Sequence, residues 1–414
     1  MTLALRSLLV AALACIAGAP RGVLAQTPSH PAGVSLREAI AAALLNNPDV
    51  LLARAAVDSA RAERRIAGAL PNPTLATVPN SPFQYSASIP LDITPARLYR
   101  GRAATLGVDA SNADGRDARR QITFAVVRSF YDLLLAEKRR DLSSERRDAV
   151  HQVLVADSTR VRSGEIASHN LARSEVEMAR ADADFARADV DVQSARFTLE
   201  ALMGERRADT SFAVNGSLDY RGLQPKSDSL VAIALASRPD LQASLARVDQ
   251  SHAAKQLTSS LLIPVPVLSY VRQYTAPFDN GRFSAIGLSF ELPSLDLFGG
   301  QRSRASAAEE SARLARRRIE IQVERDVASA LAEFRIQGAL VERYRGGLLD
   351  HVEESVKAAR YAYARGATSL LDVLDAVRSQ QDVQVDYFTA LHDYWLSVYG
   401  LNAAVGVDLF GLDG

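Results

Sequence analysis

The chain has 414 residues, of which 48% are hydrophobic and 23% are charged, with 48 basic and 48 acidic residues. This balance argues against a nucleic-acid-binding protein, which needs a clustered basic surface. The abundance of Ala, Arg, Asp, Leu and Val, together with helical periodicity, predicts long or coiled helices.

Residues 1–25 are typical of a signal peptide for export. A short apolar stretch at 7–19 is followed by the small residues of 23–25, and cleavage would leave Gln26 as the first residue. The mature chain would then lack Cys15, the only cysteine, so we expect neither disulfides nor thiolate metal sites. The alternative is a lipoprotein with Cys15 lipidated, although ALAC is a poor lipobox. After the signal, no stretch approaches the ~18 to 20 apolar residues of a membrane helix.

The remaining chain divides into two similar halves, which we place at 26–220 and 221–414. The motif NNPD at 46–49 returns as SRPD at 237–240. Each half begins with a helix, and in the first half Ser35 with Glu38 makes a capping box. The spacing between matching motifs grows by about ten residues at one place, as expected for an insertion in an exposed loop.

A strand pair follows the first helix of each half, at about 74–93 and at about 267–297. Apolar and polar residues alternate there with period two, which indicates strands with one apolar face. Strands of about ten residues have the length of those in membrane β-barrels. Four strands cannot close a barrel and open edges are not tolerated in lipid, so several chains would have to combine. Three chains would supply twelve strands. The alternative is a soluble four-stranded sheet covered by helices.

Long helical hairpins are predicted at about 117–203 and at about 301–404, because neither stretch contains proline. Large residues recur every seventh position in the first stretch, which specifies a close-packed coiled coil; they are Leu171, Met178, Phe185, Val192 and Leu199. Gly164 and Gly366 lie near the middle of the two stretches, where antiparallel arms would turn. Arms of some 45 residues would extend about 70 Å, more than a compact domain can hold.

These features together resemble the TolC family of outer-membrane efflux ducts. Besides the duplicated order of elements, the resemblance rests on LDLFGGQRSRASAAEE at 295–310, YARGATSLLDVLDA at 363–376 and ALHDYWLSVYGLNAAVG at 390–406. It covers roughly residues 35–406. The layout is also similar to the outer-membrane components of heavy-metal efflux systems.

The resemblance implies a mainly α-helical fold with a membrane β-barrel portion. Three chains would form a twelve-stranded barrel in the lipid of the outer membrane and a twelve-helix tunnel across the periplasm. The tunnel would meet a periplasmic adaptor and an inner-membrane pump. It would pass substrates to the exterior in a tripartite efflux or type I secretion system, with the pump choosing the substrate. The alternative is a non-channel periplasmic adaptor or scaffold, but adaptors normally carry one hairpin beside a lipoyl-like domain.

Asp372 and Asp375 lie three residues apart shortly after Gly366, so on a helix they share one face. Neither a nucleophile nor a histidine partner accompanies them, and the six histidines form no metal-binding pair. We therefore predict no catalytic, cofactor or metal site, and no enzyme. As solvated acids they would favour the start of a helix. The resemblance instead implies a pore constriction at the periplasmic mouth, where rings of carboxylates select cations.

The resemblance also supplies candidate gate contacts. Tyr363, Gly366 and the two aspartates fall on family motif positions. In the best-known members of the family, an arginine two residues after that glycine helps to tie the closed tip together. Here the position is Thr368, and the position of its usual acidic partner is Asn170. If the duct closes, we expect it to use other contacts.

Overall fold

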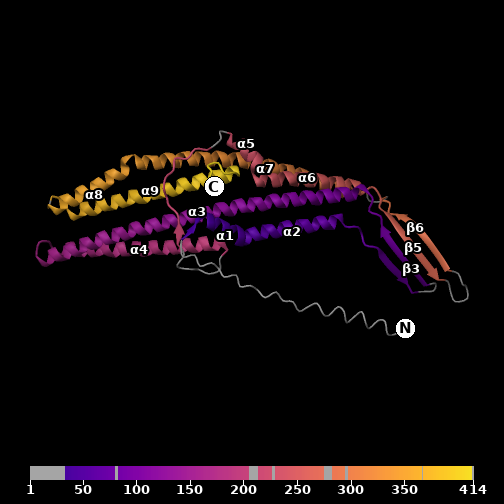
Figure 1. Cartoon of the computed structure of the whole chain (residues 1–414), viewed down its shortest axis with the longest axis horizontal. Helices are drawn as coiled ribbons and strands as arrows, with labels where there is room; N and C mark the ends of the chain where they lie inside the picture. The colour runs from indigo at the N-terminus through magenta and orange to yellow at the C-terminus, as the bar shows by residue number, and fades with distance from the viewer. Residues whose placement is uncertain are drawn as a thin grey trace, which may run out of the picture.

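The structure, a computed structural model, describes residues 33–79, 83–204, 213–225, 229–274, 282–293, 297–365 and 367–412. The molecule is elongated, with a β-sheet at one end, the turns of two helical hairpins at the other, and shorter helices around the middle (Figure 1). The predicted signal peptide and the predicted turn residue Gly366 lie outside the described residues.

The described elements follow one another in the same order in both halves. The first half contains β1 (Val34–Ser35), α1 (Leu36–Asn46), α2 (Pro48–Gly68), β2 (Thr74–Val78), β3 (Phe83–Pro90), α3 (Pro95–Arg162) and α4 (Ser168–Met203). The short strand β4 (Val214–Asn215) comes before the second half, which contains α5 (Leu230–Ser237), α6 (Pro239–Ser260), β5 (Pro266–Tyr274), β6 (Arg282–Phe290), α7 (Gly299–Arg343), the π-helical turn η1 (Tyr344–Leu348), α8 (Leu349–Ala364) and α9 (Leu370–Val405). Each half thus presents one strand pair and one long hairpin.

A proline divides the opening helices of each half. Pro48 has no N–H and disfavours a helical conformation at the residue before it, so α1 ends and α2 begins around Asn47. The Asn47 side chain accepts a hydrogen bond of 2.9 Å from the backbone N–H of Asp49 and thereby caps α2. Within the described residues, no single helix is long and apolar enough to cross a membrane. Only α1 and α2 taken together meet that test, and they are bent by 44°.

The first long helix starts earlier than the sequence predicted. We expected the hairpin to begin near residue 117, whereas α3 begins at Pro95 and runs unbroken for 68 residues. Glycines in this part lower the intrinsic helix propensity, but packing against α2 and α6 overrides it. At Gly107 a Cβ atom would lie 2.9 Å from Nε2 of Gln250, so the glycine permits a close approach of α6.

The second long hairpin is interrupted, which corrects the prediction of one continuous arm from residue 301. The first arm loses its helical conformation at Gly346 and Gly347, and Gly347 has a φ of 110°, which favours glycine. The chain then resumes as α8. The corresponding part of α3 in the first half is an unbroken helix. The two hairpins therefore differ in stiffness at the same level.

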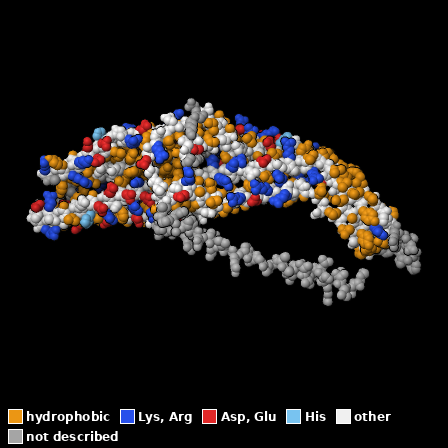
Figure 2. Space-filling view, viewed as in Figure 1, with side chains coloured by type: hydrophobic (Ala, Val, Ile, Leu, Met, Phe, Trp, Pro, Cys, Tyr) orange, Lys and Arg blue, Asp and Glu red, His pale blue; other side chains and the backbone are white. Residues whose placement is uncertain are grey.

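The sheet has the strand order β2-β3-β5-β6, with every neighbouring pair antiparallel. The pairing of β3 with β5 joins the two halves, and Ala87, Tyr270 and Ile286 lie opposite one another across three strands. Both β3 and β6 are shorter than predicted, since they end at Pro90 and Phe290. Apolar side chains on one face of the sheet remain exposed, and hydrophobic groups gather over this end of the molecule (Figure 2).

The main hydrophobic core lies at the middle of the molecule, where both halves meet. The ring of Tyr131 in α3 stacks on Trp395 of α9 with 5.8 Å between centroids. Trp395 donates a hydrogen bond of 3.0 Å to the carbonyl of Asp219, and Tyr394 donates one of 2.5 Å to that of Arg221. These bonds fasten the segment 213–225 across α9 and close the core.

Candidate functional site

The first hairpin turns at Gly164, as its position in the sequence predicted. Gly164 has a φ of 77°, a conformation that costs other residues roughly 1 to 2 kcal/mol. Its N–H bonds the carbonyl of Val161 at 3.1 Å, and the next N–H, of Glu165, bonds that of Arg160 at 2.8 Å. The turn therefore satisfies the last carbonyls of α3 and reverses the chain into α4.

Asp372 forms a capping box at the start of α9. Ser369 accepts a hydrogen bond from the N–H of Asp372, and the Asp372 carboxylate accepts 2.9 Å and 2.8 Å bonds from the N–H and hydroxyl of Ser369. Thr368 donates a further hydrogen bond to the same oxygen. The bonds from Thr368 and then from Ser369 lower the pKa of Asp372. The structure thus assigns this exposed carboxylate a local role in starting the helix, and keeps it ionised.

Asp375 is also exposed, one turn further along α9, and it begins a longer acidic stripe that sequence reasoning did not find. Asp382, Asp386 and Asp393 continue at spacings of three, four or seven residues, which place all five on one side of the helix. The first four are exposed and Asp393 is half-buried. The pattern was readable from the sequence, because Arg378 is the only Lys or Arg within α9. The stripe gives one side of α9 a strongly negative character.

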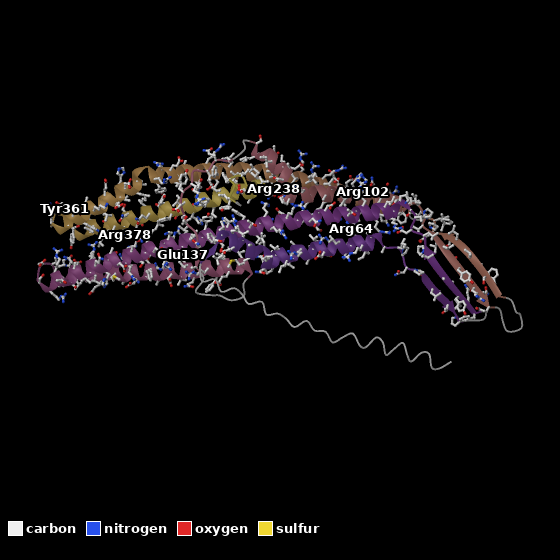
Figure 3. The ribbon with its side chains drawn as sticks, viewed as in Figure 1. Arg64, Arg102, Glu137, Arg238, Tyr361 and Arg378 are labelled. Atoms are coloured by element: carbon white, nitrogen blue, oxygen red, sulfur yellow. The ribbon has the colours of Figure 1, made fainter. Side chains whose placement is uncertain are left out.

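Two arginines that the sequence analysis did not single out connect the hairpins near their ends. Arg160 of α3 donates a hydrogen bond of 2.7 Å to the hydroxyl of Tyr363 in α8 and lies over its ring at 5.5 Å. Arg378 of α9 lies 3.4 Å from a carboxylate oxygen of Glu177 in α4, near the hairpin ends (Figure 3). Arg160 lies four residues before Gly164, and Tyr363 lies three residues before Gly366. This similar placement of both residues just before a predicted turn was the sequence signal for their contact.

The other two predicted gate residues, Thr368 and Asn170, form hydrogen bonds within their own hairpins. The Thr368 hydroxyl is used by Asp372, as described above. Asn170 lies in the first turn of α4, where its carbonyl accepts a bond of 3.3 Å from the hydroxyl of Ser174. The contact between Arg160 and Tyr363, which joins the two hairpins near their ends, involves neither Thr368 nor Asn170.

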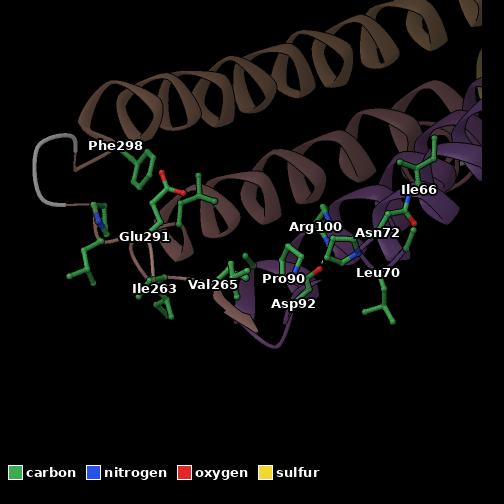
Figure 4. Close-up of a pocket in the computed structure, with 18 residues that line it drawn as sticks. Ile66, Leu70, Asn72, Pro90, Asp92, Arg100, Ile263, Val265, Glu291 and Phe298 are labelled. Carbon is green, nitrogen blue, oxygen red and sulfur yellow. Dashed lines mark hydrogen bonds and ion pairs between the residues drawn. The ribbon is translucent and has the colours of Figure 1, made fainter. Parts of the chain in front are cut away.

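A cavity lies where the helices meet the sheet (Figure 4). This cavity of about 970 Å³ is bordered by the ends of α2 and α6 and by the first turns of α3. Arg100 organises one wall, because it pairs with Asp92 and donates a 2.9 Å bond to the carbonyl of Ala67. These bonds link the end of α2 to the chain leaving β3. We assign them a structural role in joining helices to sheet.

Over the described part of the chain, no group of three or more His, Cys, Asp or Glu side chains is placed to hold a metal ion. What the tip does offer is charge, in the exposed carboxylates of Asp372 and Asp375 at the start of α9. Such a surface can attract cations.

Comparison with known proteins identifies the family. The family model described as outer membrane efflux protein matches residues 39–205 and 230–407. The cobalt-zinc-cadmium resistance protein CzcC of Cupriavidus metallidurans is 26% identical over 392 residues, which span 92% of each chain. The solved structure of CusC, 19% identical, has a TM-score of 0.77 and covers 90% of this chain and 92% of that one. The open state of the MtrE outer membrane channel of Neisseria gonorrhoeae, 20% identical, also has a TM-score of 0.77, covering 91% and 89%. The chain therefore belongs to the outer membrane efflux protein family.

Proposed function

We propose that three copies of this outer-membrane efflux channel enclose a single duct, which receives its cargo from a periplasmic adaptor and an inner-membrane pump. The observation that carries the proposal is the sheet with two unpaired edges, β2 and β6, fused to hairpins far longer than a compact core requires. Unpaired edges are unfavourable in lipid, and pairing β6 of one copy with β2 of the next would remove them. Three copies would close a twelve-stranded barrel.

We further propose that Asp372 and Asp375 line the periplasmic mouth of this duct. Both carboxylates are exposed in the single chain, and the capping box holds the first turn of α9 in a defined position. Three copies would place six carboxylates around one opening, where they would attract cations and repel anions. The acidic stripe along α9 would extend this negative surface into the tunnel.

The cargo we propose is a divalent metal cation. Two observations support it: the resemblance over most of its length to a protein named for cobalt, zinc and cadmium resistance, and the acidic stripe of α9. Loss of the gene should sensitise the native host to these three metals and leave its tolerance of apolar drugs unchanged. Equal sensitisation to drugs would contradict the metal assignment without affecting the duct.

The test of the mouth is single-channel recording of the purified protein in a planar bilayer. Asp372→Asn combined with Asp375→Asn removes both charges, while asparagine at 372 can still accept the bond from the N–H of Ser369. We expect the cation preference and the block by multivalent cations to be lost. Asp58→Asn, which removes an exposed carboxylate of α2 outside the stripe, is the matched control. Wild-type selectivity in the double variant would show that the two aspartates only start the helix.

A further inference from the structure

His392 is the one buried histidine among the residues that the structure describes. Its Nε2 atom lies 2.8 Å from a carboxylate oxygen of Asp132 in α3, and its Nδ1 atom lies 2.8 Å from one of Asp393 in α9. An ionised carboxylate only accepts hydrogen bonds, so both ring nitrogens must donate, and only the protonated imidazolium can do so. Asp132 and Asp393 are both about half exposed, whereas the ring between them is covered.

This ring joins the two halves of the chain, since Asp132 and His392 are 260 residues apart in sequence. Burial by itself favours the neutral ring. The hydrogen bonds to Asp132 and then to Asp393, together with their charges, outweigh that effect and raise the pKa of His392 above its usual value. The two hydrogen bonds and the raised pKa both indicate a charged ring at neutral pH.

The imidazole ring of His392 lies close to the level at which the second hairpin is interrupted. The ring of Tyr344 in η1 lies 6.2 Å from that of Tyr387, so the glycine break lies level with a part of α9 only five residues before His392. One arm of the second hairpin has therefore lost its helical continuity at this level. The other arm, α9, is continuous and is bonded to α3 through His392. Beyond this level, the hairpin continues to its tip, where Asp372 lies in the first helical turn of α9.

We propose that His392 is a proton-dependent clamp, which holds α9 against α3 at the point where the second hairpin is free to bend. Loss of the proton would leave one carboxylate facing a ring nitrogen that no longer donates, and the two would repel each other. The bend at Gly346 and Gly347 would then meet less resistance. The consequence for the periplasmic mouth rests on the proposed duct; the clamp itself does not.

Other charged groups near this junction lie on α3, α7 and α9. Arg139 of α3 bonds Thr389, Lys138 of α3 lies over the ring of Phe388, and Glu342 of α7 accepts a hydrogen bond from Tyr220. The charge of Asp386 in α9 acts on Tyr344. The helix α5 (Leu230–Ser237) contains no charged residue. The two charged partners of the ring are therefore Asp132 and Asp393.

The direction of the pH dependence follows from the raised pKa. The clamp is fully formed below the ordinary histidine pKa of about 6.5 and is lost as the pH rises through the raised value in the folded protein. We expect α9 to be held firmly at about pH 6 and to loosen at alkaline pH. A group whose pKa was lowered would give the opposite trend.

The test uses the full-length protein purified in detergent and two exchange measurements read by mass spectrometry. Deuterium exchange at the C2 carbon of the histidines should report a pKa for His392 above the usual histidine value. Amide exchange of peptides from 383–400, corrected for intrinsic rate, should lose protection about tenfold or more between about pH 6 and about pH 9. His392→Gln should remove this pH dependence.

Two further variants keep the result interpretable. His252→Gln removes a half-exposed histidine that bonds Glu309 and does not join α3 to α9, so it should leave exchange in 383–400 unchanged. Asp132→Asn keeps the ring but removes one charge, and should shift the transition to lower pH. A His392 that titrates at or below the usual value, or an unchanged pH dependence in His392→Gln, overturns the clamp. Exchange is measured whether or not the protein conducts, so this outcome is distinct from failure of the proposed duct.

Discussion

A charge placed at the middle of the sheet tests whether its apolar face meets lipid. Ile286 is the central residue of β6, about 13 Å from either end at ~3.3 Å per residue, and 78% of it is exposed in the single chain. That position corresponds to the centre of an apolar band about 25 Å tall. Ile286→Arg should cost roughly 2 to 4 kcal/mol per chain at that depth. This corresponds to roughly 30- to 800-fold in the assembly equilibrium.

The assay is refolding from urea into lipid vesicles, with trimer yield read from heat-modifiable migration on a gel. Ala285→Arg is the matched control, because the adjacent residue lies at the same depth and points to the opposite face of the strand. We expect Ile286→Arg to lose most of its trimer while Ala285→Arg keeps it. Normal assembly of Ile286→Arg together with failure of Ala285→Arg would refute the orientation inferred for the sheet.

Three further changes test the packing of the helical part. Asn47→Ala removes the cap of α2 and the 2.9 Å bond to the carbonyl of Leu202, and should lower the free energy of unfolding by about 1 to 2 kcal/mol in a urea titration. Gly204→Ala should be more severe, because the new Cβ would lie 2.6 Å from the carbonyl oxygen of Asn46 in a left-handed conformation that alone costs roughly 1 to 2 kcal/mol; a thermal melt at wild-type temperature would contradict this. The pKa of Glu309 is lowered to about 2, first by Lys255 and then by His252, so its contribution to stability is present above the usual glutamate range and is lost as pH falls toward about 2. Glu309→Gln should flatten the acid limb of a stability-against-pH curve.

The order of the elements was predictable because local rules act within a few residues. Proline at 48 and at 239 cannot continue a preceding helix, and both positions begin new helices in the structure. Alternation of apolar and polar residues marked the strands, and the heptads of α4 predicted its packing on α3, where Val192 and Leu199 are buried. The family was predictable from the resemblance that the motifs carry, and the family model confirms it.

Tertiary structure decided the features that depend on partners far apart in the chain. The early start of α3 at Pro95 comes from packing on α2 and α6, against a glycine-containing local sequence. Arg160 meets Tyr363 across 203 residues, and Asp132 meets His392 across 260, so neither contact is set by interactions between sequence neighbours. Asp372 was visible as an acid near a helix start, but whether its carboxylate caps that helix depends on the rotamer and on the turn before it. Local periodicity thus sets which segments form helices and strands, while the bonds that hold the hairpins together arise only when the folded chain brings distant side chains into contact.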